Sequence, residues 1–270
     1  MRLPALLACL IAAPALAQDT APAAEPAAAP AEPPALVIYD YEVVSSHPHD
    51  PLAYTQGLFF DGDQLWESTG QVGRSSLRRV DLESGEVEAT AEIPSPYFGE
   101  GSVAIGDRVF MVTWRLGAGF IFDRETLEEI GEFDIDGEGW GLTTDGESLI
   151  LSDGSHRLRY LDPETGRVTR RLEVTFQGRP VEEINELEWV DGQIWANIYG
   201  STEAIRIDPE TGYLTGVINF ARLFQEVGVP NNYDHVPNGI AWNGEDPDVL
   251  HVTGKQWPRL YEIRLSAADQ

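Results

Sequence analysis

Glu100, Lys255 and a set of amide and aromatic side chains occupy equivalent points of a sequence repeat. The residues directly before the first apolar stretch of each repeat are Gln56, Glu100, Trp140, Asn185 and Asn238. The residues that follow the second apolar stretch are Gly70, Trp114, Gly154, Tyr199 and Lys255. Repeats retained only for packing would carry similar residues at these points. The mixture of one carboxyl, one ammonium group, amides and flat rings therefore predicts a small-ligand site.

The repeat that positions these side chains is a β-hairpin with a glycine in its turn. The turn glycines are Gly62, Gly106, Gly146, Gly192 and Gly244. Their spacing of about 40–50 residues is typical of β-propeller blades. A second hairpin follows each first one, as at 162–166, where proline presets φ and glycine supplies a positive φ. Two hairpins per repeat predict an all-β fold, a five-bladed β-propeller with four-stranded antiparallel blades.

The strand register explains why the two sets of side chains should meet. The two strands of each first hairpin are antiparallel, so the start of one and the end of the other lie at the same mouth of the central channel. Only three strands are evident in the last repeat. Segment 38–44 is predicted to supply the fourth strand, and this closes the ring and removes its exposed edges.

The N-terminal region is predicted to precede the folded domain. Residues 1–17 have the pattern of a secretory signal peptide, with Arg2, an apolar run and small residues before the cleavage point. The apolar run is shorter than the about 20 residues that span a bilayer, so no stable membrane anchor is expected. Residues 18–35 are predicted to be a disordered Ala/Pro-rich tether, and residues 36–270 the propeller. We therefore expect a periplasmic or secreted protein.

Composition and charge exclude several classes of function. The chain of 270 residues carries 45 acidic and 18 basic side chains, a formal net charge of −27, so nucleic acid binding is not expected. The one cysteine, Cys9, lies in the predicted signal peptide, which excludes disulfides and thiol catalysis in the mature chain. We expect a monomer.

A metal-dependent hydrolase, such as a propeller lactonase, is a weaker interpretation. It would need several carboxylates or histidines that converge on the channel. The two sets of side chains contain one carboxyl, Glu100, and the histidines have no third ligand at a suitable spacing. No metal in the site and no cofactor for catalysis are therefore predicted. A structural calcium ion is compatible with so acidic a chain, but the sequence does not place one.

Six short motifs, taken in order, resemble the glutamine cyclotransferase family, the plant and bacterial type of glutaminyl cyclase. The motifs are Tyr54-Thr-Gln-Gly-Leu, Phe98-Gly-Glu-Gly, Trp140-Gly-Leu, Asn185-Glu-Leu-Glu, Trp195-Ala-Asn and Thr253-Gly-Lys-Gln-Trp-Pro. The resemblance runs from about Tyr41 to Leu265. It implies a five-bladed propeller that acts without catalytic zinc, with Glu100 as the essential acid.

The resemblance also implies the other residues of the site. These are Gln56, Phe98, Trp114, Trp140, Asn185 and Lys255. Tyr54 stands where phenylalanine is usual, and Tyr199 where better-known members carry tryptophan, so both positions keep an aromatic wall. The implied substrates are peptides or small proteins whose N-terminal glutamine is cyclised to pyroglutamate with release of ammonia. In that reaction Lys255 or Asn185 would donate to the oxyanion, and Gln56 would hold the substrate backbone.

One alternative stays open on the sequence alone, a non-catalytic secreted propeller that binds a peptide or partner protein at the same mouth. Propellers host many functions, so the fold does not decide between the two. The combination of Glu100 with Lys255 and Asn185 favours the enzyme, because a pure binding module needs no acid/base carboxyl.

Overall fold

The structure, a computed structural model, describes residues 34–268 and is built almost entirely of β-strands. The predicted signal peptide and all but the end of the predicted tether lie outside the described residues. Within residues 34–268, no helix is long and apolar enough to cross a bilayer.

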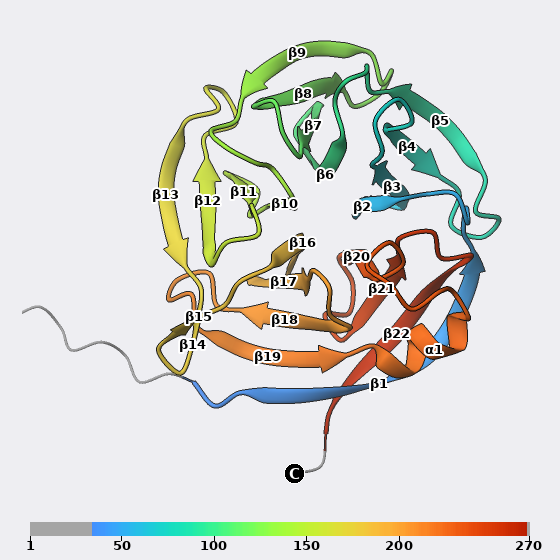
Figure 1. Cartoon of the computed structure of the whole chain (residues 1–270), viewed down its shortest axis with the longest axis vertical. Coiled ribbons are helices and arrows are strands. Elements are labelled where there is room, and N and C mark those ends of the chain that lie inside the picture. The colour runs from blue at the N-terminus through green and yellow to red at the C-terminus, as the bar shows by residue number, and fades with distance from the viewer. Residues whose placement is uncertain (1–33, 269–270) are drawn as a thin grey trace, which may run out of the picture. The chain divides into compact units, whose positions relative to one another are not determined.

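Three antiparallel sheets of four strands follow one another along the chain (Figure 1). The first contains β2 (Thr55–Asp61), β3 (Gln64–Thr69), β4 (Ser76–Val80) and β5 (Val87–Glu92). The second contains β6 (Gly99–Ile105), β7 (Arg108–Thr113), β8 (Ala118–Asp123) and β9 (Glu129–Asp134). The third contains β10 (Leu142–Thr144), β11 (Leu149–Leu151), β12 (Arg157–Leu161) and β13 (Val168–Glu173). In each sheet the strands lie in chain order, as two consecutive hairpins predict.

A larger sheet of eight strands has the order β16-β17-β18-β19-β1-β22-β21-β20. Its strands are β1 (Val37–Pro48), β16 (Ile184–Val190), β17 (Gln193–Ile198), β18 (Glu203–Ile207), β19 (Leu214–Asn219), β20 (Pro237–Ala241), β21 (Val249–Gly254) and β22 (Arg259–Ala267). Strand β1 pairs antiparallel with β22, so the predicted pairing of the two chain ends is present. Strand β1 also pairs in parallel with β19 through Val37, Ile38 and Tyr39, which the repeat did not predict. This parallel contact merges two groups of four strands into one sheet.

The repeat pattern also did not predict two small elements in the connections between strands. Strands β14 (Thr175–Phe176) and β15 (Arg179–Pro180) form a short hairpin after β13, and α1 (Ala221–Val227) follows β19. Phe224 of α1 stacks on Trp257, with 6.1 Å between the ring centroids. The helix therefore supports the turn that follows β21.

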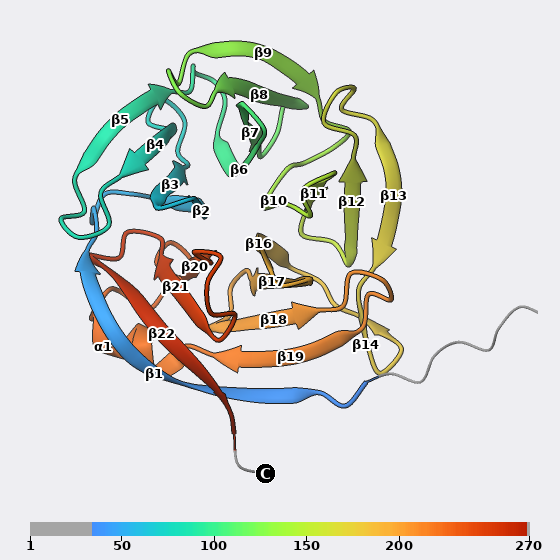
Figure 2. The same ribbon diagram turned by 180° about the vertical axis from the view of Figure 1, so that it is seen from behind.

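The first strands of the hairpins surround a common centre (Figures 1 and 2). Strands β2, β6, β10, β16 and β20 contact one another in a closed cycle, while β5, β9, β13 and β1 lie at the periphery. Burial follows this arrangement, because most residues of β2 are buried and those of β5 are exposed or half-buried. The hydrophobic core lies between neighbouring sheets, where Trp66 and Phe120 belong to one cluster. Hence the arrangement is propeller-like.

Glycines directly after two of the predicted site residues allow the inner strands to meet. A Cβ on Gly101 would lie 2.4 Å from the backbone nitrogen of Leu142. A Cβ on Gly141 would lie 2.0 Å from the carbonyl oxygen of Asn185. Only a residue without a side chain fits such an approach. The close contacts at Gly101 and Gly141 therefore hold the start of β10 against the starts of β6 and β16.

Candidate active site

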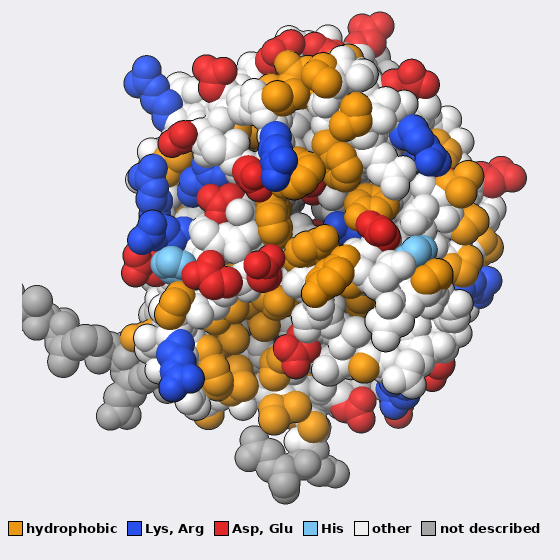
Figure 3. Space-filling view, in the orientation of Figure 1, with side chains coloured by type: hydrophobic (Ala, Val, Ile, Leu, Met, Phe, Trp, Pro, Cys, Tyr) orange, Lys and Arg blue, Asp and Glu red, His pale blue; other side chains and the backbone are white. Residues whose placement is uncertain are grey.

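All nine residues that the sequence predicted for the site line one cavity of about 170 Å³. They are Tyr54, Gln56, Phe98, Glu100, Trp114, Trp140, Asn185, Tyr199 and Lys255. The cavity opens near the centre of the ring of inner strands, where Figure 3 shows a hollow bordered by hydrophobic side chains.

The side chains reach the cavity from both ends of the inner hairpins. Gln56, Glu100 and Asn185 lie near the start of β2, β6 and β16. Lys255 directly follows the end of β21. Trp114 directly follows the end of β7. The expectation that both ends of these hairpins lie at one mouth is therefore confirmed.

Glu100 lines the cavity and is almost fully buried. It is 5 % exposed. Burial raises the pKa of its carboxyl well above the usual range, the Lys255 ammonium opposes this shift and the Glu138 carboxylate adds to it. A carboxyl with such a raised pKa is a stronger base than an ordinary carboxylate and can return the proton that it accepts.

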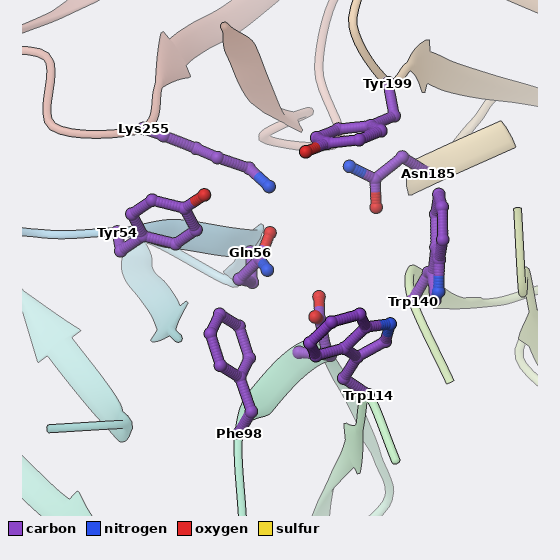
Figure 4. A pocket seen from close by; sticks show the side chains of 9 residues that line it. Tyr54, Gln56, Phe98, Trp114, Trp140, Asn185, Tyr199 and Lys255 are labelled. Carbon is purple, nitrogen blue, oxygen red and sulfur yellow. The ribbon is translucent and has the colours of Figure 1, made fainter. Parts of the chain in front are cut away.

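Lys255 approaches the cavity from the other side, between two phenol rings (Figure 4). Its Nζ lies 4.9 Å from the ring centroid of Tyr54 and 5.1 Å from that of Tyr199. Both distances allow cation–π contact. Burial lowers the pKa of Lys255 to about 8, against the opposing carboxylates of Glu100 and Asp234. The ammonium is thus poised to titrate just above neutral pH.

Asn238 does not line the cavity but orients the two amides that do. The Asn185 Nδ2 donates to Asn238 Oδ1 at 3.0 Å, and the Asn238 Nδ2 donates to Gln56 Oε1 at 3.1 Å and to the Thr55 carbonyl at 2.9 Å. These bonds leave the Asn185 oxygen and the Gln56 nitrogen to face a ligand, as the orientation of Asn185 in Figure 4 illustrates. Asn185 therefore offers the cavity a hydrogen-bond acceptor.

Five aromatic side chains form the wall of the cavity, and we call them the aromatic belt: Tyr54, Phe98, Trp114, Trp140 and Tyr199. Phe98 meets Tyr54 and Trp114 edge-on, at 6.0 and 5.8 Å between ring centroids. Trp140 meets Tyr199 at 5.7 Å. The belt thus consists of two arcs, with one gap between the two indoles and one between the two phenols. Lys255 spans the gap between the phenols.

Gly70 and Gly154 lie behind the belt rather than in the cavity. A Cβ on Gly70 would lie 2.2 Å from the ring of Phe98, and one on Gly154 would lie 2.6 Å from the ring of Trp140. Each glycine therefore makes room for an aromatic ring that faces the cavity. The repeat register predicted their positions correctly but not this supporting role.

Three residues at the mouth were missed because they belong to connections that carry no repeat. The carboxylate of Glu138 accepts hydrogen bonds from both indoles of the belt. The carboxylate of Asp234 accepts a hydrogen bond from the Tyr54 hydroxyl at 3.2 Å. The ring of Tyr233 lies 5.9 Å from that of Tyr199. Glu138 lies two residues before Trp140. An acidic residue so close to a predicted site tryptophan only weakly indicates a role in the site, and the sequence offers no stronger indication.

The described part of the chain, residues 34–268, offers no cluster of metal ligands. In this part of the chain, no group of three or more His, Cys, Asp or Glu side chains is arranged to hold a metal ion. The buried His49 instead pairs with Glu67 at 3.0 Å.

Comparisons with known proteins agree with this geometry. The sequence profile of the family described as glutamine cyclotransferase matches residues 10–265. The chain is 43 % identical over 235 residues to a glutaminyl-peptide cyclotransferase of Arabidopsis thaliana, covering 86 % of this chain and 73 % of the relative. Its fold is similar to that of the crystal structure of Myxococcus xanthus glutaminyl cyclase, with a TM-score of 0.80 and 35 % identity over 87 % of this chain and 100 % of the other.

Proposed function

Because this chain belongs to the glutamine cyclotransferase family, we propose that the cavity around Glu100 is where it cyclises the N-terminal glutamine of peptides. The product is an N-terminal pyroglutamate, and ammonia is released. The observation that carries the assignment of the site is a buried carboxyl with a raised pKa that faces a small aromatic cavity.

Glu100 relays one proton in the proposed reaction. The neutral α-amino nitrogen of the substrate attacks Cδ of its own glutamine side chain, and the proton that the nitrogen loses passes to the Glu100 carboxylate. The protonated Glu100 then donates this proton to the amide nitrogen as the bond from Cδ to that nitrogen breaks. Ammonia leaves and the carboxylate is restored. A positioned acid/base group of this kind typically contributes about 10²–10⁴-fold in rate.

The other polar groups of the cavity take the roles that their orientations allow. Negative charge develops on the side-chain carbonyl oxygen, and Lys255 stabilises it as the cationic donor. The free nitrogen of Gln56 donates to a substrate oxygen, and the Asn185 oxygen accepts from the attacking or the leaving nitrogen. The aromatic belt folds the flexible glutamine side chain toward a near-attack shape and excludes water. All of these roles belong to protein side chains, so we propose that catalysis requires no metal or cofactor.

The role of Glu100 is tested by Glu100→Gln, which keeps the shape of the side chain but removes the proton relay. We expect ammonia release from a Gln-initiated dipeptide to fall by at least about 10²-fold, with the far-UV circular dichroism unchanged. The matched control is Glu188→Gln, because Glu188 is also buried with a raised pKa but does not line this cavity. Turnover of Glu100→Gln close to that of Glu188→Gln would remove Glu100 from the role.

We further infer that the eight-stranded sheet consists of two blades joined by the parallel contact of β1 with β19, which makes five blades in all. The closed cycle of five inner strands supports this. We also propose that residues 1–17 direct export to the periplasm or the medium and that the mature protein is a monomer that acts on peptides or small proteins. The support for export is the signal-peptide pattern of the sequence.

A further inference from the structure

The gap between the two indoles of the aromatic belt is bridged by a single carboxylate from outside the cavity. Trp114 Nε1 donates to Glu138 Oε2 at 2.9 Å, and Trp140 Nε1 donates to the same oxygen at 3.0 Å. Trp114 follows β7 and Trp140 precedes β10, so the two indoles belong to neighbouring sheets. One oxygen atom therefore links the two arcs of the belt. Hydrogen bonds to a charged acceptor of this kind are stronger than bonds between neutral groups.

Arg115 completes the arrangement on the solvent side. Its Nε donates to Glu138 Oε1 at 3.2 Å, and its guanidinium lies 3.7 Å from the ring centroid of Trp114. Burial works to raise the pKa of Glu138, but the hydrogen bonds from Trp140, Arg115 and Trp114 outweigh it and lower the pKa below the usual value. Glu138 thus stays ionised at the pH at which Glu100 titrates.

The backbone that carries Glu138 is itself held in place. Arg159, which is only 7 % exposed, donates to the carbonyl of Glu138 at 2.6 Å and to the carbonyl of Asp136. The Gly139 nitrogen donates to the Thr113 carbonyl at 3.1 Å. The Glu138 carboxylate therefore has a defined position before any substrate enters, which is the condition for preorganisation.

We propose that Glu138 is a positioning residue, which aligns Trp114 and Trp140 as one continuous wall and thereby holds the substrate glutamine for attack. Glu138 joins the two indoles at one gap of the belt, and Lys255 lies between Tyr54 and Tyr199 at the other gap. This inference rests on the proposed cyclisation in the cavity. Glu138 itself does not line the cavity, so it acts through the two indoles rather than on the substrate.

The charge of Glu138 has a second, separable effect. Among the titratable groups that act on Glu100, the Lys255 ammonium lowers its pKa and the Glu138 carboxylate raises it. The phenols of Tyr54 and Tyr199 stay neutral, since burial raises the pKa of each. Removal of the Glu138 charge should therefore lower the pKa of Glu100 and move the acidic limb of the kcat/KM profile to lower pH. A residue that only maintained the fold would not shift this limb.

The test compares Glu138→Ala and Glu138→Gln with Asp136→Asn. Asp136 is exposed and lies in the same connection, and its side chain makes no hydrogen bond to the belt, so it is a matched control. With a Gln-initiated dipeptide, we expect Glu138→Ala to lower kcat/KM by about 10–100-fold, because misplaced substrate groups of this kind cost up to about 10²-fold. Glu138→Gln keeps an acceptor oxygen and should recover part of this loss. Both Glu138 variants should shift the acidic limb downward, and Asp136→Asn should not.

A spectroscopic arm tests the contact independently of turnover. Glu138→Ala should change the near-UV circular dichroism of the tryptophans and leave its far-UV spectrum as in the wild type. Both spectra of Asp136→Asn should equal those of the wild type. The inference would be overturned if Glu138→Ala had the same near-UV spectrum, the same kcat/KM and the same acidic limb of the pH profile as Asp136→Asn. Failure of the wild-type protein to release ammonia would instead overturn the proposed function, and the near-UV spectra would still report whether Glu138 aligns the indoles.

Discussion

The pKa values of Glu100 and Lys255 are displaced in opposite directions by the same burial. Burial disfavours the charged form of each group, so the pKa of the carboxyl rises and that of the ammonium falls to about 8. The basic form of Glu100 and the acidic form of Lys255 are both required by the proposed mechanism. At the scale of the residue, this pair predicts a bell-shaped dependence of kcat/KM on pH.

Lys255→Met tests this reading. Without the ammonium, the pKa of Glu100 should rise further, because Lys255 opposes the effect of burial. The acidic limb should then move to higher pH, opposite to the shift expected for the Glu138 variants, and the basic limb near pH 8 should disappear. Loss of the oxyanion donor should also lower kcat by about 10²–10³-fold. A retained basic limb in the pH–rate profile would assign that limb to a different group.

At the scale of the element, the glycines behind the belt set the position of the aromatic rings. Gly154→Ala would place a methyl group 2.6 Å from the ring of Trp140. Gly146→Ala is the matched control, since both glycines have positive φ, +80 and +92, but nothing lies within 4 Å of a Cβ on Gly146. We expect both variants to lose about 1 kcal/mol of stability from backbone strain, and only Gly154→Ala to lose kcat/KM, by about tenfold. Equal kcat/KM for the two variants would mean that the ring adapts to the methyl group.

A buried ion pair joins three elements behind the site. His49 lies in the connection between β1 and β2, and its Nε2 donates to Glu67 of β3 at 3.0 Å. Its Nδ1 donates to the Trp257 carbonyl at 2.6 Å. Burial works to lower the pKa of His49 and to raise that of Glu67, but their mutual attraction outweighs it, so the pKa of His49 is raised and that of Glu67 lowered. The Arg78 guanidinium also lowers the pKa of Glu67.

The signs of these shifts give a pH window for stability. The contribution of Glu67 is present above its ordinary pKa of 4.5 and is lost as the pH falls through its lower value in the fold. The contribution of His49 is present below 6.5 and is lost as the pH rises through its raised value. Glu67→Gln should therefore lower the free energy of unfolding most between these two pH limits, by about 3 kcal/mol. Urea unfolding at several pH values measures this. The control is Glu83→Gln, which removes the exposed partner of a different histidine, His47, and should change the free energy of unfolding by almost nothing. A loss that did not vary with pH would contradict the assignment.

At the scale of the whole molecule, β1 joins the ends of the chain. It pairs with β22 from Tyr39 to Pro48, and the Tyr41 hydroxyl accepts a hydrogen bond from the Leu223 nitrogen at 3.0 Å. Removal of residues 1–44 should expose an edge of β22, lower the melting temperature and promote aggregation. Removal of residues 1–35 leaves β1 complete and should change neither property. Similar melting temperatures for the two truncations, measured by calorimetry, would show that closure does not depend on this strand.

Much of this arrangement follows from the sequence alone because strand register is local. Glu100 and Trp114 lie at the two ends of one hairpin, so counting along the antiparallel pair places both at the same mouth. The same count applied to the other repeats placed Trp140, Tyr199 and Lys255 at this mouth. Tyr54 and Phe98 were implied only by the family resemblance, and the missing fourth strand of the last repeat predicted the pairing of β1 with β22. Family resemblance then supplied the reaction, which the residue pattern did not specify.

Only the tertiary structure decided which groups outside the repeat meet the site. Glu138, Asp234 and the parallel contact of β1 with β19 belong to segments outside the repeat, where no periodicity relates position in the sequence to position in space. The orientation of the Asn185 amide likewise depends on Asn238, from another strand of the inner ring. Such contacts depend on the distances between packed sheets, and these are set by side-chain volume and close packing across the whole ring.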